Sequence, residues 1–470
     1  MLELNTVLGY TCQVRNTTLH PGGYYAINGS NMDIEDWKKK NSCVKGYSHF
    51  DKKVSLVQCW SYISNPDNIK RHSFYPFIHY SINNTKYNKE KGVVPKFRDI
   101  CYPAHIDRCI YQYYSFLLNQ KYNQRVIADG ISESAIAYRN NLGMSNINFA
   151  KRAFDFIRNF NSCYIIVGDF TDFFGSIDHK YLKKQLLSLL VCKSLPPDYY
   201  AVYKNITRYS VWDLESLLAL NGLKKSKAGV KALNDKVQVL SHSDFKKYKS
   251  QYVKPNKETY GIPQGSPISA VLSNIYMLEF DKLINEYVKI NNGLYMRYSD
   301  DFIIVFPNVE KSTFKEHLKW VQDTIRSIPH LTLQSEKTQI FHFDSKRVRN
   351  CNDEFLERVK RGKNVLNYLG FAFDGDIITV RDKTITKYYY RLYRKIKTIV
   401  KNNGYTYKGN KIGFKKLYLM YSCKGAHVGN GNFLTYIERC ERVFGKGEAI
   451  NRGTKRHLQK IRKRLNKIPK

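Results

Sequence analysis

The chain has 470 residues, which exceeds one ordinary globular domain and suffices for two or three compact lobes. Hydrophobic residues make up 43% of it, and 77 Lys and Arg against 40 Asp and Glu give a net charge of +37. This excess favours a polyanionic partner, with nucleic acid ahead of a membrane surface, because no apolar run reaches the roughly 18 residues that span a bilayer.

Targeting and redox features predict a soluble, cytoplasmic protein. The first residues, MLELNTVLGYTCQVRN, lack a basic segment followed by an uninterrupted apolar core, so we expect no signal peptide. The ten cysteines include no CxxC pair and no Cys/His cluster at zinc spacing. We therefore expect them to be reduced and mostly buried.

The first part of the chain, residues 1–90, is polar and aromatic with little periodicity, and we interpret it as an N-terminal extension. A Lys- and Arg-bearing extended piece follows, and apolar residues at helical spacing then predict a helix near Ile106 to Leu118. The run Tyr164 to Val167 predicts a buried strand, which ends just before Asp169.

The middle of the chain alternates helices and strands. The segment HKYLKKQLLSLL predicts a helix with Asp178 as its N-cap, and residues 195–258 are interpreted as an irregular, Lys-rich insertion. After GIPQGSP, apolar residues of ISAVLSNIYMLEFDKLINEYV fall on one helical face. YMRYSDDFIIVF predicts a β-hairpin with Ser-Asp-Asp at its turn. An amphipathic helix near residues 314–325, the strand-like LTLQSEKTQIFHF and a hairpin in NYLGFAFDGDIITV complete this part.

The last part, residues 376–470, carries 25 Lys and Arg against 5 Asp and Glu, so more than half of the excess charge lies in the last fifth of the chain. Stretches such as KYYYRLYRKIKTIVKN predict helices. We expect this basic helical part to bind a polyanion.

Two acidic positions carry the chemistry. Asp169 ends one expected strand, and Asp300 sits at the tip of an expected hairpin 131 positions later. Neighbouring strands of one sheet would bring them together, and clustered carboxylates repel one another unless a cation neutralises them. Magnesium suits such oxygen ligands, and two ions can hold the attacking and leaving oxygens of a phosphoryl transfer.

The motifs DFTDFFGSIDH, GIPQGSPISAVLSN, YSDD, LQSEKT and YLGF follow one another in the order of the palm motifs of reverse transcriptases, and residues 95–375 resemble that family. The resemblance implies a right-handed polymerase of the α/β (α+β) class. Residues 91–375 would form fingers and a palm with an antiparallel sheet, and residues 376–470 a basic helical thumb or C-terminal extension. It also implies an RNA-directed DNA polymerase with two Mg²⁺ ions, which Mn²⁺ can replace, and an RNA template, deoxynucleoside triphosphates and a DNA product as partners.

Carried over position by position, the resemblance implies roles for individual residues. It makes Asp169 and Asp300 metal ligands, with the Phe170 carbonyl completing the sphere, and Asp301 the second acid of the pair. It also implies two further sets, the nucleotide-binding residues Lys96, Arg98, Arg139, Phe174, Gln264, Gly265 and Lys337, and the primer grip Tyr368, Leu369, Gly370 and Phe371. Phe174 would exclude a ribose 2′-hydroxyl, and Lys337 would lie near the leaving pyrophosphate.

Each role has a structural alternative. Asp301 can be a turn residue, Phe174 a core residue, and Gln264 and Gly265 a helix-start turn. The four basic residues can be solvated surface, and the primer grip can be an ordinary core hairpin. Two positions depart from the family pattern: Ser299 replaces the usual apolar residue of YxDD, and Gly175 stands where an acidic or amide residue is common.

The subgroup is interpreted from what the sequence lacks. No HNH-like or Cys-rich endonuclease segment and no NAxxH or VTG signature is present, which disfavours group II intron and retron enzymes. The remainder resembles bacterial reverse transcriptases of the abortive-infection and defence-associated groups, and this implies phage defence with an associated non-coding RNA. Protein-primed or untemplated synthesis, an RNA polymerase, a retron or intron enzyme and a silent RNA-binding scaffold stay open, as does a homo-oligomer.

Overall fold

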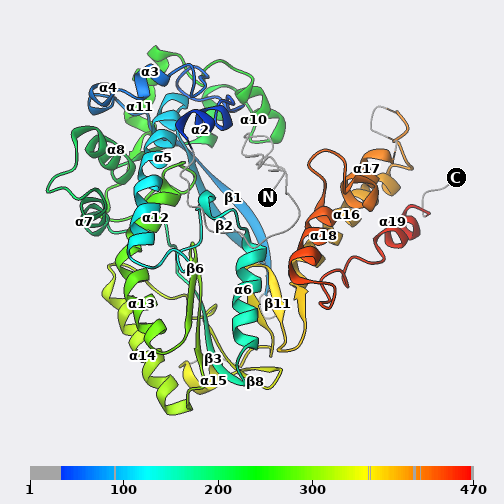
Figure 1. Cartoon of the computed structure of the whole chain (residues 1–470). Helices are drawn as coiled ribbons and strands as arrows, with labels where there is room; N and C mark the ends of the chain where they lie inside the picture. The colour runs from blue at the N-terminus through cyan, green and yellow to red at the C-terminus, as the bar shows by residue number, and fades with distance from the viewer. Residues whose placement is uncertain are drawn as a thin grey trace.

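The computed structural model describes residues 33–88, 92–357, 359, 361–405, 409–412 and 414–466, and within these ranges no side chain is described for residues 84–88, 93, 96 and 140. The fold is mixed α/β with three sheets (Figure 1). None of the helices in the described ranges is long and apolar enough to cross a bilayer. The nine described cysteines are free and six of them are buried, as expected.

A five-stranded antiparallel sheet forms the centre of the molecule, with the strand order β6-β7-β3-β8-β9. Its strands are β3 (Ser162–Asp169), β6 (Leu294–Tyr298), β7 (Asp301–Pro307), β8 (Gln339–Asp344) and β9 (Arg347–Asn350). The expected buried strand and the YSDD hairpin are therefore confirmed, and they are neighbours in this sheet. Of the strand-like run 331–343, only the end forms a strand, β8.

The two faces of the central sheet contribute to different cores because successive strand residues point to opposite sides. Tyr164 and Ile166 of β3 belong to the larger core, and Cys163 and Ile165 to the other. The larger core also takes residues from α5 (His105–Ala128), α7 (His179–Leu190), α12 (Ser269–Tyr276), α13 (Leu278–Ile290) and α14 (Lys311–Ser327). The opposite core contains α6 (Asn146–Arg158) and the small sheet described below.

Four of the expected helices are present, with differences in length, and the one expected in the basic last part is α16 (Asp382–Lys401). The helix expected at 106–118 extends to Ala128, and the Asp178 side chain accepts a hydrogen bond from the Tyr181 amide at 2.7 Å, so this N-cap is confirmed. The apolar segment after GIPQGSP is not one helix, because it breaks at Met277 between α12 and α13. The amphipathic helix near residues 314–325 is α14.

A four-stranded sheet, β2-β1-β4-β5, and seven short helices form the N-terminal region at the top of Figure 1. Its strands are β1 (Phe77–Asn88), β2 (Gly92–Tyr102), β4 (Ser210–Asp213) and β5 (Lys254–Pro255). Its helices are α2 (Ile34–Lys40), α3 (Trp60–Ile63), α4 (Pro66–Lys70), α8 (Pro197–Thr207), α9 (Leu214–Leu220), α10 (Lys227–Asn234) and α11 (His242–Tyr252).

This region corrects two expectations. The segment 195–258 is not irregular, because β4 pairs in parallel with β1. Trp212 of β4 is fully buried in a third core, which also contains residues of β1 and β2. The helices of this segment are short and rich in exposed lysines, so few apolar residues recur at helical spacing in its sequence. The boundary at residue 90 also divides one β-hairpin, since β1 pairs with β2 along its whole length.

The C-terminal part begins with a small antiparallel sheet of β10 (Leu366–Tyr368), β11 (Phe371–Phe373) and β12 (Ile378–Val380), which confirms the expected hairpin. The helices α16 (Asp382–Lys401), α17 (Lys415–Tyr421), α18 (Phe433–Phe444) and α19 (His457–Leu465) follow and lie to one side in Figure 1. They share a core of their own around Leu392 and Ile461, while α18 also contributes to the core of α6. Three short elements remain, η1 (Asn140–Leu142), α15 (Asn352–Phe355) and η2 (Cys423–Gly425).

Candidate active site

Three acidic residues meet at one end of the central sheet. Asp169 is the last residue of β3, and it lies directly opposite Asp301, the first residue of β7. Asp300 immediately precedes β7, and its carbonyl oxygen accepts a hydrogen bond from the Phe170 amide at 3.1 Å. The structure thus brings together the residues that the sequence placed 131 positions apart.

Lys337 is the positive counterpart of this cluster. Its Nζ lies 2.8 Å from Asp169 Oδ2, and 41% of its side chain is exposed against 14% for Asp169. Lys337 follows a short turn before β8, where its amide donates to the Gln334 carbonyl. An ammonium group therefore neutralises part of the carboxylate cluster.

The electrostatics of the cluster are visible at Asp301. Although this residue keeps an exposed face, its carboxyl pKa is raised to about 7 by burial against the sheet edge and by the negative charges of Asp300 and Asp169. The Lys337 charge acts in the opposite direction. The two like charges favour the same direction, so a cation bound beside them would favour ionisation of all three carboxylates at neutral pH.

The donor set fits a divalent metal chemically, since carboxylate and carbonyl oxygens are the ligands of Mg²⁺. The Phe170 residue forms a bridge with Leu333, in which the Asp169 carbonyl and the Thr171 amide take part. None of these bonds engages the Phe170 carbonyl. Among the side chains that the structure describes, no three His, Cys, Asp or Glu converge as a metal-binding group, and Lys337 occupies one oxygen of Asp169.

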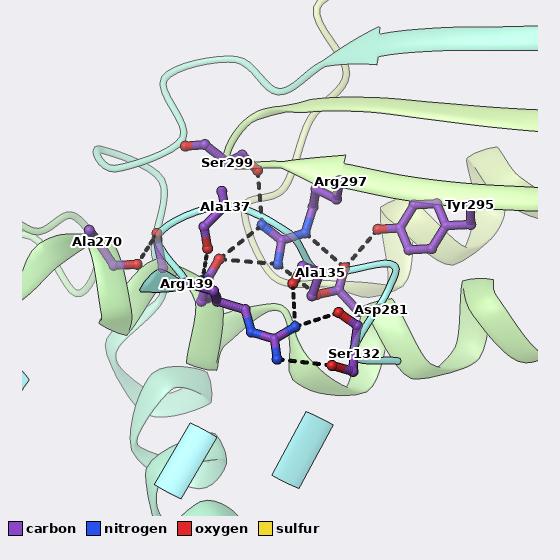
Figure 2. A network of polar contacts seen from close by, with 11 residues as sticks. Ser132, Ala135, Ala137, Arg139, Ala270, Asp281, Tyr295, Arg297 and Ser299 are labelled. Carbon is purple, nitrogen blue, oxygen red and sulfur yellow. Dashed lines mark hydrogen bonds and ion pairs between the residues drawn. The ribbon is translucent and has the colours of Figure 1, made fainter. Parts of the chain in front are cut away.

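A buried polar network supports the turn that carries Asp300 (Figure 2). The Arg297 guanidinium donates to both carboxylate oxygens of Asp281, at 2.7 and 2.6 Å, and neither side chain is exposed to solvent. Arg297 Nη1 also donates to the Ser299 carbonyl at 2.9 Å, and the Tyr295 hydroxyl donates to Asp281 at 2.7 Å. Asn274 joins this set by donating to the Ala137 carbonyl. We call Ala137, Asn274, Asp281, Tyr295, Arg297 and Ser299 the turn network.

Arg139 corrects an expectation. Instead of facing a triphosphate, it is 4% exposed, and its guanidinium donates to Asn123, to Ser132 and to the Ala135 carbonyl (Figure 2). Burial also lowers its pKa. A buried guanidinium with this many acceptors holds the surrounding loop together, so we leave Arg139 out of the candidate nucleotide site.

Tyr138 is a site residue that the sequence reasoning missed. Its hydroxyl lies 2.8 Å from Ser299 Oγ, and 41% of the residue is exposed. Partial burial of the phenol raises its pKa, and the Asp300 charge acts in the same direction. Tyr138 and Ser299 both have positive φ angles, 61° and 63°. Such angles are uncommon outside glycine and cluster at functional sites. Only its position beside Arg139 in the AYR segment could have drawn attention to it.

The loop with the sequence GIPQG holds the segment that contains Phe174. The Ile262 amide donates to the Phe174 carbonyl at 2.9 Å, and the Gly261 amide to the Ile177 carbonyl at 2.8 Å. Phe174 is half-buried at the edge of the core, and its neighbour Phe173 is fully in the core. The backbone at Phe174 is therefore held by this loop, and its ring packs 5.8 Å from that of Phe173, centroid to centroid.

The departure at Gly175 has a local explanation. A Cβ at this position would collide with the carboxylate of Asp172, which folds over the same turn. A larger residue here would require the exposed Asp172 side chain to turn away.

Gly265 serves a contact within the protein. Its φ is 118°, and a Cβ there would collide with the Cys101 carbonyl of β2. The Cys101 amide donates to the Gln264 carbonyl at 2.8 Å. The close approach expected at this glycine is thus to the β2 backbone, and it joins the N-terminal sheet to the rim of the site.

The other expected residues lie on two β-hairpins. Arg98 is exposed on β2, and the Lys96 side chain lies outside the described residues. Tyr368 and Phe371 end and begin the strands of a hairpin whose turn, Leu369 and Gly370, has positive φ angles of 45° and 94°. Asn146 of α6 donates to the Leu369 carbonyl at 2.9 Å and so anchors this turn.

The chain matches one protein family and is similar to several solved structures. A family model described as reverse transcriptase (RNA-dependent DNA polymerase) matches residues 88–373. A search of curated proteins returned no match. The chain is similar to the structure of apo telomerase from Candida tropicalis truncated from its C-terminal domain, with 14% identity and a TM-score of 0.40 over 70% of this chain and 61% of that one. It is also similar to telomerase from Candida albicans in complex with a TWJ fragment of telomeric RNA, with 14% identity and a TM-score of 0.39 over 93% and 65%. The chain spans less than two thirds of either protein's length.

Proposed function

Because the chain belongs to the reverse transcriptase family, we propose that it copies RNA into DNA and that Asp169, Asp300 and Asp301 form its catalytic centre. The observation that supports this assignment is the placement of Asp169 opposite Asp301 at the end of β3, with Asp300 in the adjoining turn. A primer hydroxyl would attack the α-phosphate of a deoxynucleoside triphosphate, and the bond to the leaving pyrophosphate would break.

The residues of the site have distinct proposed tasks. Asp169 and Asp300, with the Phe170 carbonyl, would hold Mg²⁺, which neutralises phosphate charge when bound. The Lys337 side chain would turn from Asp169 toward the leaving pyrophosphate. Its ammonium group would stay protonated at Nζ and place a positive charge beside the pyrophosphate. Phe174 would lie beneath the sugar, and Gln264 and Gly265 would border the nucleotide. Arg98 and Lys96 on β2 would bind phosphates, and residues 368–371 would support the primer.

The test is to replace Asp169 or Asp300 by Asn, which preserves shape and removes the charge. We expect no measurable deoxynucleotide incorporation on a primed RNA template with Mg²⁺. The matched control is Asp235→Asn, at an exposed position after α10, which should retain wild-type activity. Incorporation by either variant at a near wild-type rate would refute the site, and an inactive wild-type protein that still binds RNA would identify a silent scaffold.

Sugar choice separates a DNA polymerase from an RNA polymerase. The loop that contains Ile262 holds the backbone at Phe174, and a half-buried ring there would have the bulk to exclude a 2′-hydroxyl. Phe174→Ala should raise ribonucleotide incorporation relative to deoxynucleotide incorporation by roughly tenfold or more, in single-nucleotide assays. The control is Phe173→Leu, in the core behind it, which should leave sugar choice unchanged. An unchanged ratio for Phe174→Ala would count against the gate.

We further propose that the chain is a bacterial defence-associated enzyme with fingers, palm and thumb regions and an associated non-coding RNA. The support is the resemblance of its motifs and the separate basic helices in its last part. Sequencing the RNA and DNA that copurify with the protein from its host, and counting phage plaques with the wild type and Asp169→Asn, would test this. Label from a radioactive deoxynucleotide that stays covalently on the protein would favour protein priming.

A further inference from the structure

One face of α16 carries an unusual row of side chains. The residues in question are all exposed, and all but one are basic: Lys383, Lys387, Tyr390, Arg394, Lys397 and Lys401. We call them the α16 stripe. The opposite face of the helix, with Leu392 and Ile396, is buried against α17 and α19, and Asp382 is the one acidic residue in the helix.

The stripe is straight. Its members follow one another at alternating intervals of four and three residues, so at about 100° per residue they stay within about 40° of one line. From Lys383 to Lys401 the row extends about 27 Å, at 1.5 Å per residue. The helix therefore presents five cations along a nearly linear path.

The length of this path distinguishes two kinds of nucleic acid. Each strand of a double helix winds to the far side of the duplex within about 17 Å, half of a helical repeat. It therefore moves away from a straight row of cations. An unpaired strand has no such twist and can follow all five cations. The geometry thus favours one strand over a duplex.

Tyr390 lies in the middle of the row, and 62% of it is exposed. The neighbouring rings of α16 are covered by cations of α19, with Lys460 Nζ 3.9 Å from the Tyr389 ring centroid and Arg464 Cζ 3.5 Å from that of Tyr393. The Tyr390 ring has a different neighbour, the Arg394 guanidinium of the stripe itself, at 5.9 Å. An exposed aromatic ring between cations is the arrangement on which unpaired bases stack.

We infer that the α16 stripe binds one unpaired strand of RNA or DNA, with its phosphates on the lysines and arginine and a base on Tyr390. The inference deepens the proposed function and rests on it for the origin of the strand, which is template ahead of the copied region or displaced product. It does not depend on the chemistry of the carboxylates.

The experiment measures, by fluorescence anisotropy at several salt concentrations, how tightly the full chain binds labelled nucleic acids. These are unstructured 20-nucleotide strands of RNA and DNA and a duplex of the same length. Lys387→Gln/Lys397→Gln should lower the salt dependence of single-strand affinity by about 1.4 in a log–log plot, since each phosphate contact contributes about 0.7. Tyr390→Ala should weaken single-strand binding roughly tenfold, and Tyr390→Phe should restore it.

The matched control is Lys246→Gln/Lys249→Gln, which removes two exposed lysines from α11 and should leave the salt dependence unchanged. An unchanged slope for the α16 double variant, or an equal loss for duplex and single strand, would overturn the inference. Comparison of the RNA and DNA arms identifies which strand is bound. Asp169→Asn should bind like the wild type, so failure of the catalytic assignment and failure of the stripe give different results.

Discussion

Arg297 and Arg139 lie buried behind the turn that carries Asp300, with 0% and 4% of their surface exposed, whereas the cations of the α16 stripe face the solvent. The buried guanidiniums are held by carboxylate, amide and carbonyl oxygens of the protein itself. In a chain with a net charge of +37, the cations therefore divide into buried ones that pair with oxygens of the protein and exposed ones that face the solvent, where a polyanion could reach them.

The two regions also differ in what they contribute to stability. A buried ion pair is costly to break, because the remaining charge has lost its water and its partner, while an exposed lysine contributes little. Charge removal should therefore act on folding in the turn network and on binding in the α16 stripe.

The largest expected effect is on stability in the turn network. Arg297→Ala leaves the Asp281 carboxylate buried without its main partner, so we expect a loss of about 3–5 kcal/mol in the free energy of unfolding. Lys387→Ala in the stripe should change it by less than about 0.5 kcal/mol. Urea denaturation of both variants, followed by tryptophan fluorescence, provides the measurement.

A second pair of variants sharpens this result. Arg297→Met/Asp281→Leu replaces both charges by apolar groups, and much of the lost stability should return. If Arg297→Ala alone costs less than about 1 kcal/mol, the buried pair does not support the turn, and the contrast with the stripe fails.

A smaller effect concerns the pH dependence of the acidic cluster without metal. The Asp301 pKa of about 7 lies above the value of about 3.9 for an unfolded chain, so between these values the unfolded state binds fewer protons and stability falls as pH rises. Asp301→Asn cannot ionise, and it should exceed the wild type in melting temperature at pH 8 in EDTA. This advantage should shrink toward pH 5.

Asp235→Asn, at an exposed position outside the cluster, is the control and should differ from the wild type equally at both pH values. An advantage of Asp301→Asn that grows toward low pH would contradict the sign of the shift. Magnesium should reduce the advantage, because a bound cation stabilises the ionised carboxylates of the wild type.

Local sequence signals predicted the frame of the site. The strand before Asp169, the hairpin with Asp300 at its tip and the cap at Asp178 all depend on short runs of apolar and turn residues, and all are present. The role of Arg139 could not be predicted, because its acceptors lie on a neighbouring helix and loop. The same holds for Arg297, whose partner Asp281 comes from α13.

The segment 195–258 shows the same limit at a larger scale. Its lysines are exposed and its helices short, so the sequence pattern is weak, and only the pairing of β4 with β1 makes it part of a sheet. Expectations that depended on neighbours in sequence could thus be made, and one long-range expectation, the meeting of Asp169 and Asp300, could be made because both lie at strand ends that carry recognisable motifs. The buried partner of Arg297 and the pairing of β4 with β1 have no such motif, and they could not be predicted.

The smallest expected effect is at Tyr138. Its variants test whether the Tyr138 hydroxyl helps to hold the turn or contacts only nucleic acid. Tyr138→Phe keeps the ring and removes the hydroxyl that lies 2.8 Å from Ser299 Oγ, and Ser299→Ala removes the partner. Each single variant should lower kcat/KM for the incoming nucleotide about fivefold, the equivalent of one hydrogen bond of about 1 kcal/mol, and the double variant should be no worse than either. Lys387→Gln should leave this constant unchanged at saturating template. If the effects of the Tyr138 and Ser299 variants instead add in full, the two hydroxyls act separately. The exposed Tyr138 would then be a nucleic-acid contact, as proposed for Tyr390, and would not help to hold the turn.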